Sequence, residues 1–258
     1  MKLKINFFKC AAGLQNSISF VSQQTMIDLA FLEQKILSSK WWDLAMVTPD
    51  SHYSNKSGVM LSHHLEAVHE NIEHIFAKRN IGFYARLFNL LPKLDIKKDE
   101  IREDLLLVAL LHDIGKPRED KSHVIAHPLT GKPAHKRHGL VALIAAIEIL
   151  GPFLSHSPER KNRIFRTIEL HDISYGLFRE YMITGFFPQD EKWNAINDKI
   201  HSLNGAGIFY LLLFKLADVH GHANISDVTW FYNAVKQYYL KELKLELPVP
   251  VEADIRAV

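Results

Sequence analysis

Cysteine is almost absent from this sequence, with Cys10 as its single example. One cysteine cannot build an internal disulfide framework, which fits a reducing compartment. No stretch approaches 18 uninterrupted apolar residues, and Lys215 interrupts even the oily segment 208–216, so no membrane span is expected. Residues 1–13 are basic and partly apolar, but Lys9 interrupts them before the apolar core of a signal peptide forms. We therefore expect a cytoplasmic protein without a membrane partner.

A large charge of one sign is missing as well. The formal net charge is +2, so bulk electrostatics predicts no strong binding to a polyanion, and nucleic acid would have to be held locally. Internal repeats, low-complexity blocks and clear strand signals are also missing, which indicates the all-α class. Histidine is the abundant exception: the chain has 15, all between His52 and His222, and this bias points to metal binding or acid-base chemistry.

Apolar residues at helical spacing predict the elements of this all-α fold. Helices are expected over 25–46, 61–76, 83–91, 101–111, 138–150, 159–172, 192–201, 207–222 and 227–243. Turn-forming residues predict loops over 47–60 and 117–137, and residues 173–190 are expected to be irregular. The predicted organisation is an N-terminal arm and loop over 1–60 that packs on the core, a core domain over 61–243, and a C-terminal tail over 244–258.

The chain is organised around residues 101–117, IREDLLLVALLHDIGKP. Every residue over 105–111 is apolar, which predicts a helix buried on all sides. This helix ends on His112 and Asp113, whose imidazole and carboxylate are unfavourable to bury without partners. A divalent cation suits both groups, although a polar C-terminal turn explains the pair equally well on these residues alone.

Further polar residues lie on apolar helices elsewhere in the chain: His63 or His64, His138, His171 and Asp218. His63 and His64 are neighbours, so they lie about 100° apart on a helix and only one can point to a shared centre. The pattern does not choose between them.

In chain order these residues read H…HD…H…H…D, which resembles the signature of the HD superfamily of metal-dependent phosphohydrolases. The resemblance covers about residues 61–221. Locally, LLHDIGKP and GKPAHKRHGLVAL resemble the HD domain of bacterial tRNA nucleotidyltransferases, and PDSHYSNKSG is similar to the loop before the first histidine in HD-type 3′-5′ exoribonucleases. The resemblance implies an HD-domain helical bundle with an extra N-terminal helix and a C-terminal helix and tail.

The resemblance also implies a ligand set for two divalent metal ions. The first ion would be held by His63 or His64 with His112, Asp113 and Asp218, and the second by His138 and His171 with Asp113 as the bridge. Imidazoles with carboxylates suit Mn, Fe, Co or Ni, and Mg or Zn would also be accepted. Lys116 could reach a substrate phosphate and act with Asp113 in catalysis, or it could complement the helix dipole. Asp172, His135, His220 and His222 are interpreted as surface or loop residues rather than as groups that orient ligands.

The function implied is hydrolysis of a phosphomonoester or phosphodiester, such as a nucleotide or a nucleic-acid end, by a hydroxide that bridges the metals. The alternative is a non-catalytic, metal-stabilised HD module that serves as a regulatory or nucleic-acid-processing accessory protein, with residues 1–60 and the tail as partner-binding arms. No GYP-type segment follows His171, so hydrolysis of cyclic-di-GMP is not supported. No nucleotidyltransferase domain accompanies the pattern, so addition of CCA to tRNA is not expected.

Overall fold

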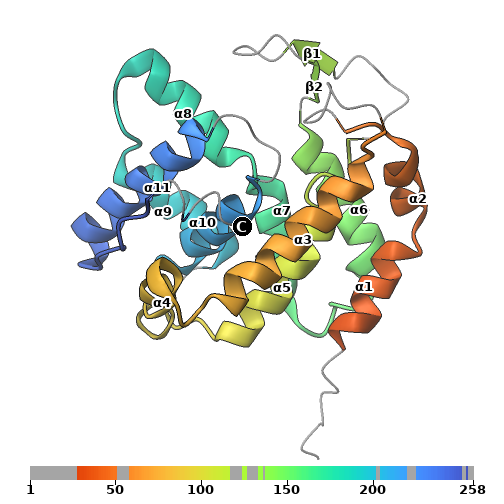
Figure 1. The fold of residues 1–258 in the computed structure, drawn as a ribbon, viewed down its shortest axis with the longest axis horizontal. Coiled ribbons are helices and arrows are strands. Elements are labelled where there is room, and N and C mark those ends of the chain that lie inside the picture. Colours follow the sequence, from red (N-terminus) through yellow and green to blue (C-terminus); the bar gives the residue numbers. More distant parts are fainter. Residues whose placement is uncertain are drawn as a thin grey trace, which may run out of the picture.

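The computed structural model describes residues 28–50, 58–116, 124–126, 133–135, 137–201, 204–219, 225–251 and 254. Helices make up most of this part of the chain, and its two strands form one short antiparallel pair (Figure 1). The predicted all-α class is therefore confirmed. Within the described residues, no helix combines the length and the apolar character needed to cross a membrane.

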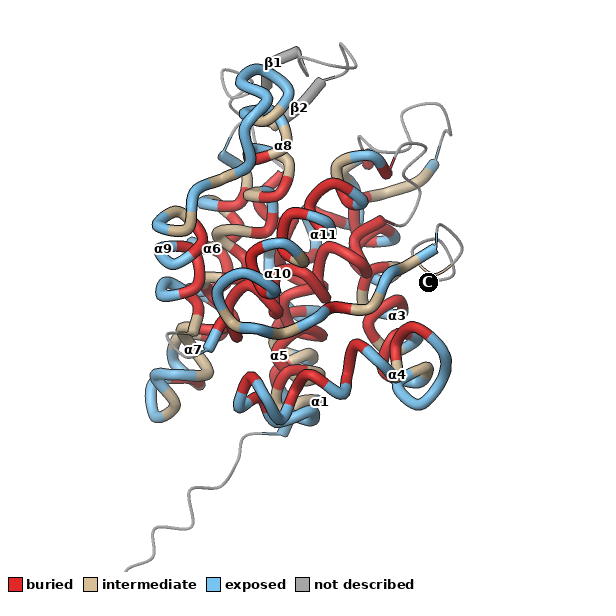
Figure 2. Tube along the Cα trace, turned by 90° about the vertical axis from the view of Figure 1, so that its left-hand side faces the viewer, coloured by how far each residue is buried: buried red, intermediate tan, exposed pale blue. Residues whose placement is uncertain are grey.

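Four helices that pack on one another form the centre of the fold: α3 (Leu61–Ala77), α5 (Lys98–Leu111), α7 (Pro158–Leu170) and α10 (Ala206–Ala217). Residues 104–111 of α5 are all buried, as expected for a helix that is apolar on every face, and α10 is buried along its whole length. Figure 2 shows these buried segments inside a more exposed outer layer. The helix that carries His112 therefore runs through the core.

Further helices cover this centre on two sides (Figure 1). On one side, α1 (Leu29–Leu37) packs on α5 and on α6 (His138–Leu150), and α2 (Lys40–Val47) packs on α3. The other side carries α8 (Ile173–Thr184), α9 (Asp190–Ile200), α11 (Ser226–Tyr238) and the π-helical turn η3 (Tyr239–Leu243). A short helix, α4 (Gly82–Phe88), and the 3₁₀ turn η1 (Leu91–Leu94) connect α3 to α5.

The single helix predicted over 25–46 is wrong, because α1 and α2 replace it in the described part of that range. The Ser38 hydroxyl donates to the carbonyl of Gln34 at 2.7 Å, which closes α1. The Ser39 hydroxyl accepts a hydrogen bond from the backbone N–H of Trp42 at 3.2 Å, which caps α2. Two adjacent serines thus end one helix and begin the next.

The irregular segment predicted over 173–190 is also wrong, because α8 occupies most of it. Gly176 lowers the helix propensity of this sequence by about 1 kcal/mol relative to alanine. Phe178 and Tyr181 nevertheless pack against Trp230 of α11, with ring centroids 5.7 and 5.3 Å apart. Tertiary packing of this aromatic face outweighs the weak local propensity.

The predicted loop over 117–137 and the C-terminal tail each have one feature that the sequence did not predict. The predicted loop over 117–137 contains β1 (Val124–Ala126) paired antiparallel with β2 (Pro133–His135). The tail has no regular structure over 244–251. Leu247 is buried, and the Tyr232 hydroxyl donates to the carbonyl of Pro248 at 2.6 Å. These contacts hold the tail against α11.

Candidate metal centre

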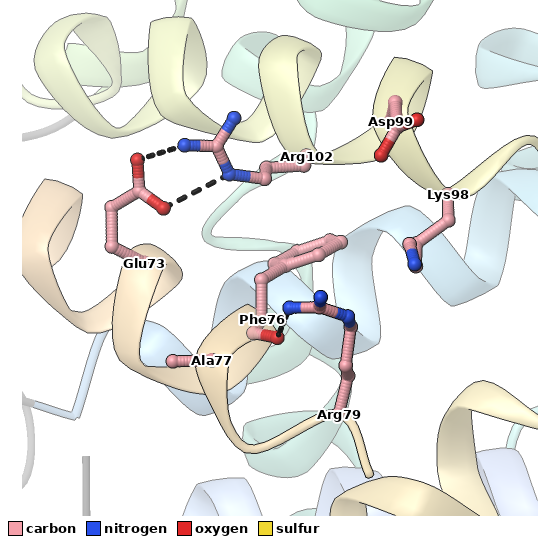
Figure 3. Close-up of a pocket in the computed structure, with 7 residues that line it drawn as sticks. All are labelled: Glu73, Phe76, Ala77, Arg79, Lys98, Asp99 and Arg102. Atoms are coloured by element: carbon pink, nitrogen blue, oxygen red, sulfur yellow. Dashed lines mark hydrogen bonds and ion pairs between the residues drawn. The ribbon is translucent and has the colours of Figure 1, made fainter.

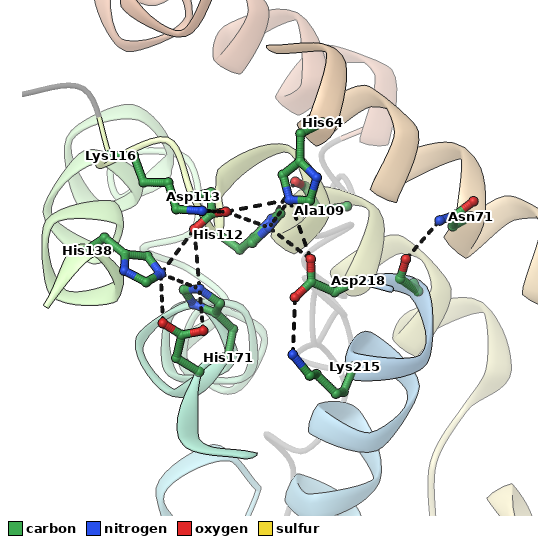
Figure 4. A network of polar contacts seen from close by, with 12 residues as sticks. His64, Asn71, Ala109, His112, Asp113, Lys116, His138, His171, Lys215 and Asp218 are labelled. Carbon is green, nitrogen blue, oxygen red and sulfur yellow. Dashed lines mark hydrogen bonds and ion pairs between the residues drawn. The ribbon is translucent and has the colours of Figure 1, made fainter. Parts of the chain in front are cut away.

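The predicted ligands come together where five helices begin or end (Figure 4). His112, His171 and Asp218 each directly follow the last residue of α5, α7 and α10. His64 lies in the first turn of α3, and His138 is the first residue of α6. Because each side chain stands at a helix end, polar groups can meet there while the apolar helix bodies stay packed together.

Four side chains form a first group: His64, His112, Asp113 and Asp218. The Nε2 atoms of the two histidines are 3.3 Å apart, and each lies 3.5 Å from Asp113 Oδ2 and 3.5 Å from Asp218 Oδ1. Atoms that coordinate one ion tetrahedrally at about 2.1 Å lie about 3.4 Å from one another. The spacing of His64, His112 and Asp113 therefore suits ligands of a single transition-metal ion, and Asp218 lies at the same distance from both imidazoles.

A second group uses the other oxygen of Asp113. Asp113 Oδ1 lies 3.1 Å from His138 Nε2 and 3.5 Å from His171 Nε2, and these two nitrogens are 3.0 Å apart. One carboxylate thus turns one oxygen to the histidines of the first group and the other oxygen to those of the second. This is the arrangement expected of a carboxylate that bridges two ions.

Hydrogen bonds to the backbone determine which nitrogen of these rings carries the proton. Three Nδ1 atoms lie 2.7–2.9 Å from carbonyl oxygens three residues earlier: His112 to Ala109, His138 to His135, and His171 to Ile168. A carbonyl oxygen can only accept, so each Nδ1 donates its proton there. Each Nε2 is then left to face the cluster as a potential metal ligand.

The short distance between His138 and His171 indicates whether a cation fits between these two rings. The Nε2 lone pairs of His138 and His171 face each other at 3.0 Å and would repel without a positive charge beside them. Burial lowers the pKa of His138, but the carboxylates of Asp172 and Asp113 raise it more strongly, to about 10. A metal ion accepts both lone pairs at once. The described residues can therefore hold a metal ion.

Two buried lysines balance the carboxylates in the metal-free protein. Lys116 Nζ pairs with Asp113 Oδ2, and Lys215 Nζ lies 3.8 Å from Asp218 Oδ2 (Figure 4). Burial raises the pKa values of Asp113 and Asp218. The facing imidazoles and lysines lower them by more than burial raises them, so both pKa values lie well below the usual range. Both carboxylates are therefore ionised at neutral pH and can bind a cation.

The structure chooses between the two adjacent histidines. His64 is fully buried in the cluster, whereas His63 is exposed on the outer face of α3. His63 Nδ1 accepts a hydrogen bond from the backbone N–H of Met60 at 3.2 Å, which caps the helix. The possibility that His63 is the ligand is therefore corrected: the geometry brings His64 to the cluster.

Two residues near the cluster were missed by the sequence interpretation. Asp172, interpreted as a surface or loop residue, has a half-exposed side chain, but its Oδ2 lies 2.8 Å from His138 Nε2. Lys215 was read only as a break in an apolar run, yet it is buried and also lies 3.5 Å from Asp227. A signal existed for both: Asp172 directly follows a predicted ligand, and a lysine within an apolar helix needs an anionic partner.

Several other histidines singled out by the sequence do not enter this geometry. His135 contributes its backbone carbonyl, which accepts a hydrogen bond from His138 Nδ1. His220 and His222 lie outside the described residues.

A separate surface pocket of about 350 Å³ lies between α3 and α5 (Figure 3). Its lining includes Glu73 and Phe76 near the end of α3, and Lys98 and Arg102 near the start of α5. The cluster is formed at the opposite ends of these two helices. Arg102 Nε donates to Glu73 at 2.9 Å, so this guanidinium is already paired. The pocket is therefore distinct from the candidate metal centre.

A matched pair of variants tests the choice between the neighbouring histidines. His64→Ala is expected to weaken binding of Co²⁺ or Mn²⁺ by at least about 10–100-fold, since even residues that only orient ligands have effects of that size. His63→Ala is expected to leave metal binding unchanged and to lower stability by about 0.5–1 kcal/mol through the lost cap. Calorimetric metal titration measures the first effect and denaturant unfolding the second. Equal metal affinity in the two variants would contradict the assignment.

Metal removal and addition should change stability in a predictable way. An ion that binds only the folded chain stabilises it by about 2.7 kcal/mol when its free concentration is 100 times Kd. For a chain of this size we expect the melting temperature to rise by roughly 5–10 °C on adding Mn²⁺ or Co²⁺ to chelator-treated protein. The control is Ca²⁺, which prefers an all-oxygen shell. A melting temperature that ignores every transition metal would argue against the centre.

Comparison with known proteins does not extend this geometry. No family model, no curated protein and no solved structure matches the chain.

Proposed function

We propose that this chain is a metal-dependent phosphohydrolase of the HD type, acting on a phosphomonoester or phosphodiester. One observation supports this most directly: the two oxygens of Asp113 face two separate pairs of imidazoles. Paired metal sites that share a ligand are typical of enzymes that hydrolyse phosphate esters. The order of the clustered residues along the chain, H…HD…H…H…D, agrees with the same assignment.

The proposal assigns an ion to each group of ligands. His64, His112, Asp113 and Asp218 would hold the first, and Asp113, His138 and His171 the second. The mixed imidazole and carboxylate set suits Mn, Fe, Co or Ni, and admits Mg or Zn. When bound, such ions activate water near neutral pH and neutralise charge on phosphoryl oxygens.

Substrate would reach the centre from the side of the second group. His64 and His112 have no exposed side-chain surface, whereas the side chains of His138 and Asp172 are 12% and 53% exposed. A phosphoryl group needs open space around its oxygens, and this is the more open side among the described residues. The proposed substrates are therefore phosphates that can enter from the start of α6 and α8, such as a nucleotide or the end of a nucleic acid.

Lys116 is proposed to bind the substrate phosphate. Its ammonium pairs with Asp113 and is buried against the cluster. Cations on the Asp113 carboxylate would take over the role of counter-ion and leave Lys116 to donate to a phosphoryl oxygen.

A hydrolysis panel tests this function. Chelator-treated protein reloaded with Mn²⁺ or Co²⁺ is expected to cleave an aryl phosphodiester, an aryl phosphomonoester, nucleotides or short oligonucleotides, and to be inactive before reloading. Lys116→Met should lower kcat/KM by roughly 10²-fold, comparable to removal of one preorganised electrostatic group. Lys98→Met, which removes a lysine from the other end of α5, is the matched control. A protein that binds both ions but cleaves nothing would favour the non-catalytic HD module.

A further inference from the structure

A second buried polar network lies in the core, away from the metal centre. Asp104 of α5 is fully buried, and its Oδ2 accepts hydrogen bonds from Arg163 Nε at 2.7 Å and from the Tyr210 hydroxyl at 3.3 Å. Its Oδ1 accepts a hydrogen bond from Arg160 Nε at 3.0 Å. Arg163 belongs to α7 and Tyr210 to α10, so one carboxylate ties together three helices.

These are the same three helices that end at the metal centre. On each of them, the residue of the network precedes the residue of the centre by eight positions. The pairs are Asp104 and His112 on α5, Arg163 and His171 on α7, and Tyr210 and Asp218 on α10. Eight residues of α-helix span about 12 Å. The three helices therefore run toward the centre in the same direction with matching offsets.

Contacts at the Asp104 network and at the metal centre show that α5 keeps the same register with α7 and α10 at both places. At the level of the network, Asp104 contacts Arg163 and Tyr210. At the level of the centre, the ring centroid of His112 lies 5.2 Å from that of His171, and its Nε2 lies 3.5 Å from Asp218. The network and the centre are thus two polar layers that join the same helices.

Stability alone is a poor reason for such a network. A buried ion pair adds little net stability compared with apolar residues of the same volume, because both charges lose their hydration. Burial of Asp104 in fact raises its pKa, although both arginines oppose that shift. Position is a better reason. Residues 105–111 of α5 and most of α10 are apolar on every face, so apolar packing by itself selects the register between them weakly.

We propose that Asp104, Arg163 and Tyr210 are positioning residues, which fix the register of α5, α7 and α10 and so hold the metal ligands at coordinating distance. The inference rests on the proposed function, in that the cluster binds cations. A slip of one residue along a helix moves a side chain by about 1.5 Å and turns it by about 100°. The ligand atoms lie 3.0–3.5 Å apart within the two groups, so such a slip would separate them.

The test separates register from stability. The apolar variant Asp104→Leu/Arg163→Met/Tyr210→Phe removes the directional contacts but keeps the core filled, and Arg160 keeps its pair with Glu103 at 2.8 Å. Its melting temperature with chelator present is expected to equal or exceed that of wild type. Its affinity for Co²⁺, read from the ligand-field spectrum during titration, is expected to fall by roughly 10–100-fold. Arg163→Lys keeps a charge at the position and should recover part of that affinity.

Two further variants complete the design. Lys241→Met removes the ion pair with Asp190, which joins segments that carry no ligand of the centre, and should leave Co²⁺ binding unchanged. Tyr210→Phe removes a single hydroxyl, and it takes the place of the apolar variant in the test if that variant does not fold. Wild-type Co²⁺ affinity in the folded apolar variant, or in Tyr210→Phe in its place, would overturn the positioning role. Absence of Co²⁺ binding by wild type would instead contradict the proposed function itself.

Discussion

Asp113→Asn is expected to have the largest effect on activity, lowering hydrolysis by at least about 10²–10³-fold, the size seen when one preorganised electrostatic group is lost. An amide offers one oxygen where the carboxylate offers two, so it cannot serve both imidazole pairs. It also removes the negative charge that would hold two cations close together. We therefore expect the variant to bind one ion less per chain than wild type.

The measurement combines metal content with turnover of an aryl phosphodiester. Asp172→Asn is the matched control, because Asp172 contacts the second group from a half-exposed position and does not join the two groups. It is expected to lose less activity than Asp113→Asn. If Asp113→Asn kept both ions and near-normal turnover, the pair formed by His112 and Asp113 would have only a structural role.

Gly115→Ala is expected to have the largest effect on the assembly of the centre. A Cβ atom at this position would lie 2.4 Å from the backbone nitrogen of Ala142 and 2.9 Å from the carbonyl oxygen of His138. Backbone atoms cannot rotate away as a side chain can, so α6 must shift. Overpacking of this kind typically lowers stability by about 1–3 kcal/mol. Because His138 begins α6, the shift should also weaken binding of the second ion.

Gly176→Ala provides the control for this substitution. Gly176 lies inside α8, and no atom of the described structure is within 4 Å of a Cβ built there. Alanine should therefore raise stability by roughly 0.5–1 kcal/mol through its better helix propensity. Denaturant unfolding and metal titration of both variants check the pair. Similar stability for the two alanine variants would show that α6 can move away from the turn that carries Gly115 at little cost, which would contradict the prediction.

The sequence predicted the all-α class because its helices show apolar residues at helical spacing or apolar runs that end at helix-breaking residues, and because strand signals are missing. It was less informative where a helix starts or breaks. His64 lies four residues before Val68, which is buried, whereas His63 lies four before the less buried Ala67. The apolar pattern of α3 therefore favours His64 as the inward-facing histidine, but only once the buried face of the helix is known. The break between α1 and α2 depends on two serine hydroxyls, whose hydrogen bonds cannot be read from periodicity.

The contacts between distant segments were beyond sequence reasoning for a physical reason. Asp104 and Arg163 are 59 positions apart, and a charged residue on an amphipathic helix such as α7 usually faces water. Only the packing of α7 against α5 turns this arginine inward. The helix α8 was missed because it is held by Trp230 of another helix rather than by its own sequence.

The unequal exposure of the two ligand groups has a consequence for metal exchange. An ion held by His64, His112, Asp113 and Asp218 would be enclosed by side chains that are at most 8% exposed, so its release requires an opening of the core. An ion beside His138 and the half-exposed Asp172 would exchange with the medium without such an opening. The inner ion would then behave as a permanent part of the folded chain. Occupancy of the outer position, and turnover with it, would follow the supply of free metal around the protein.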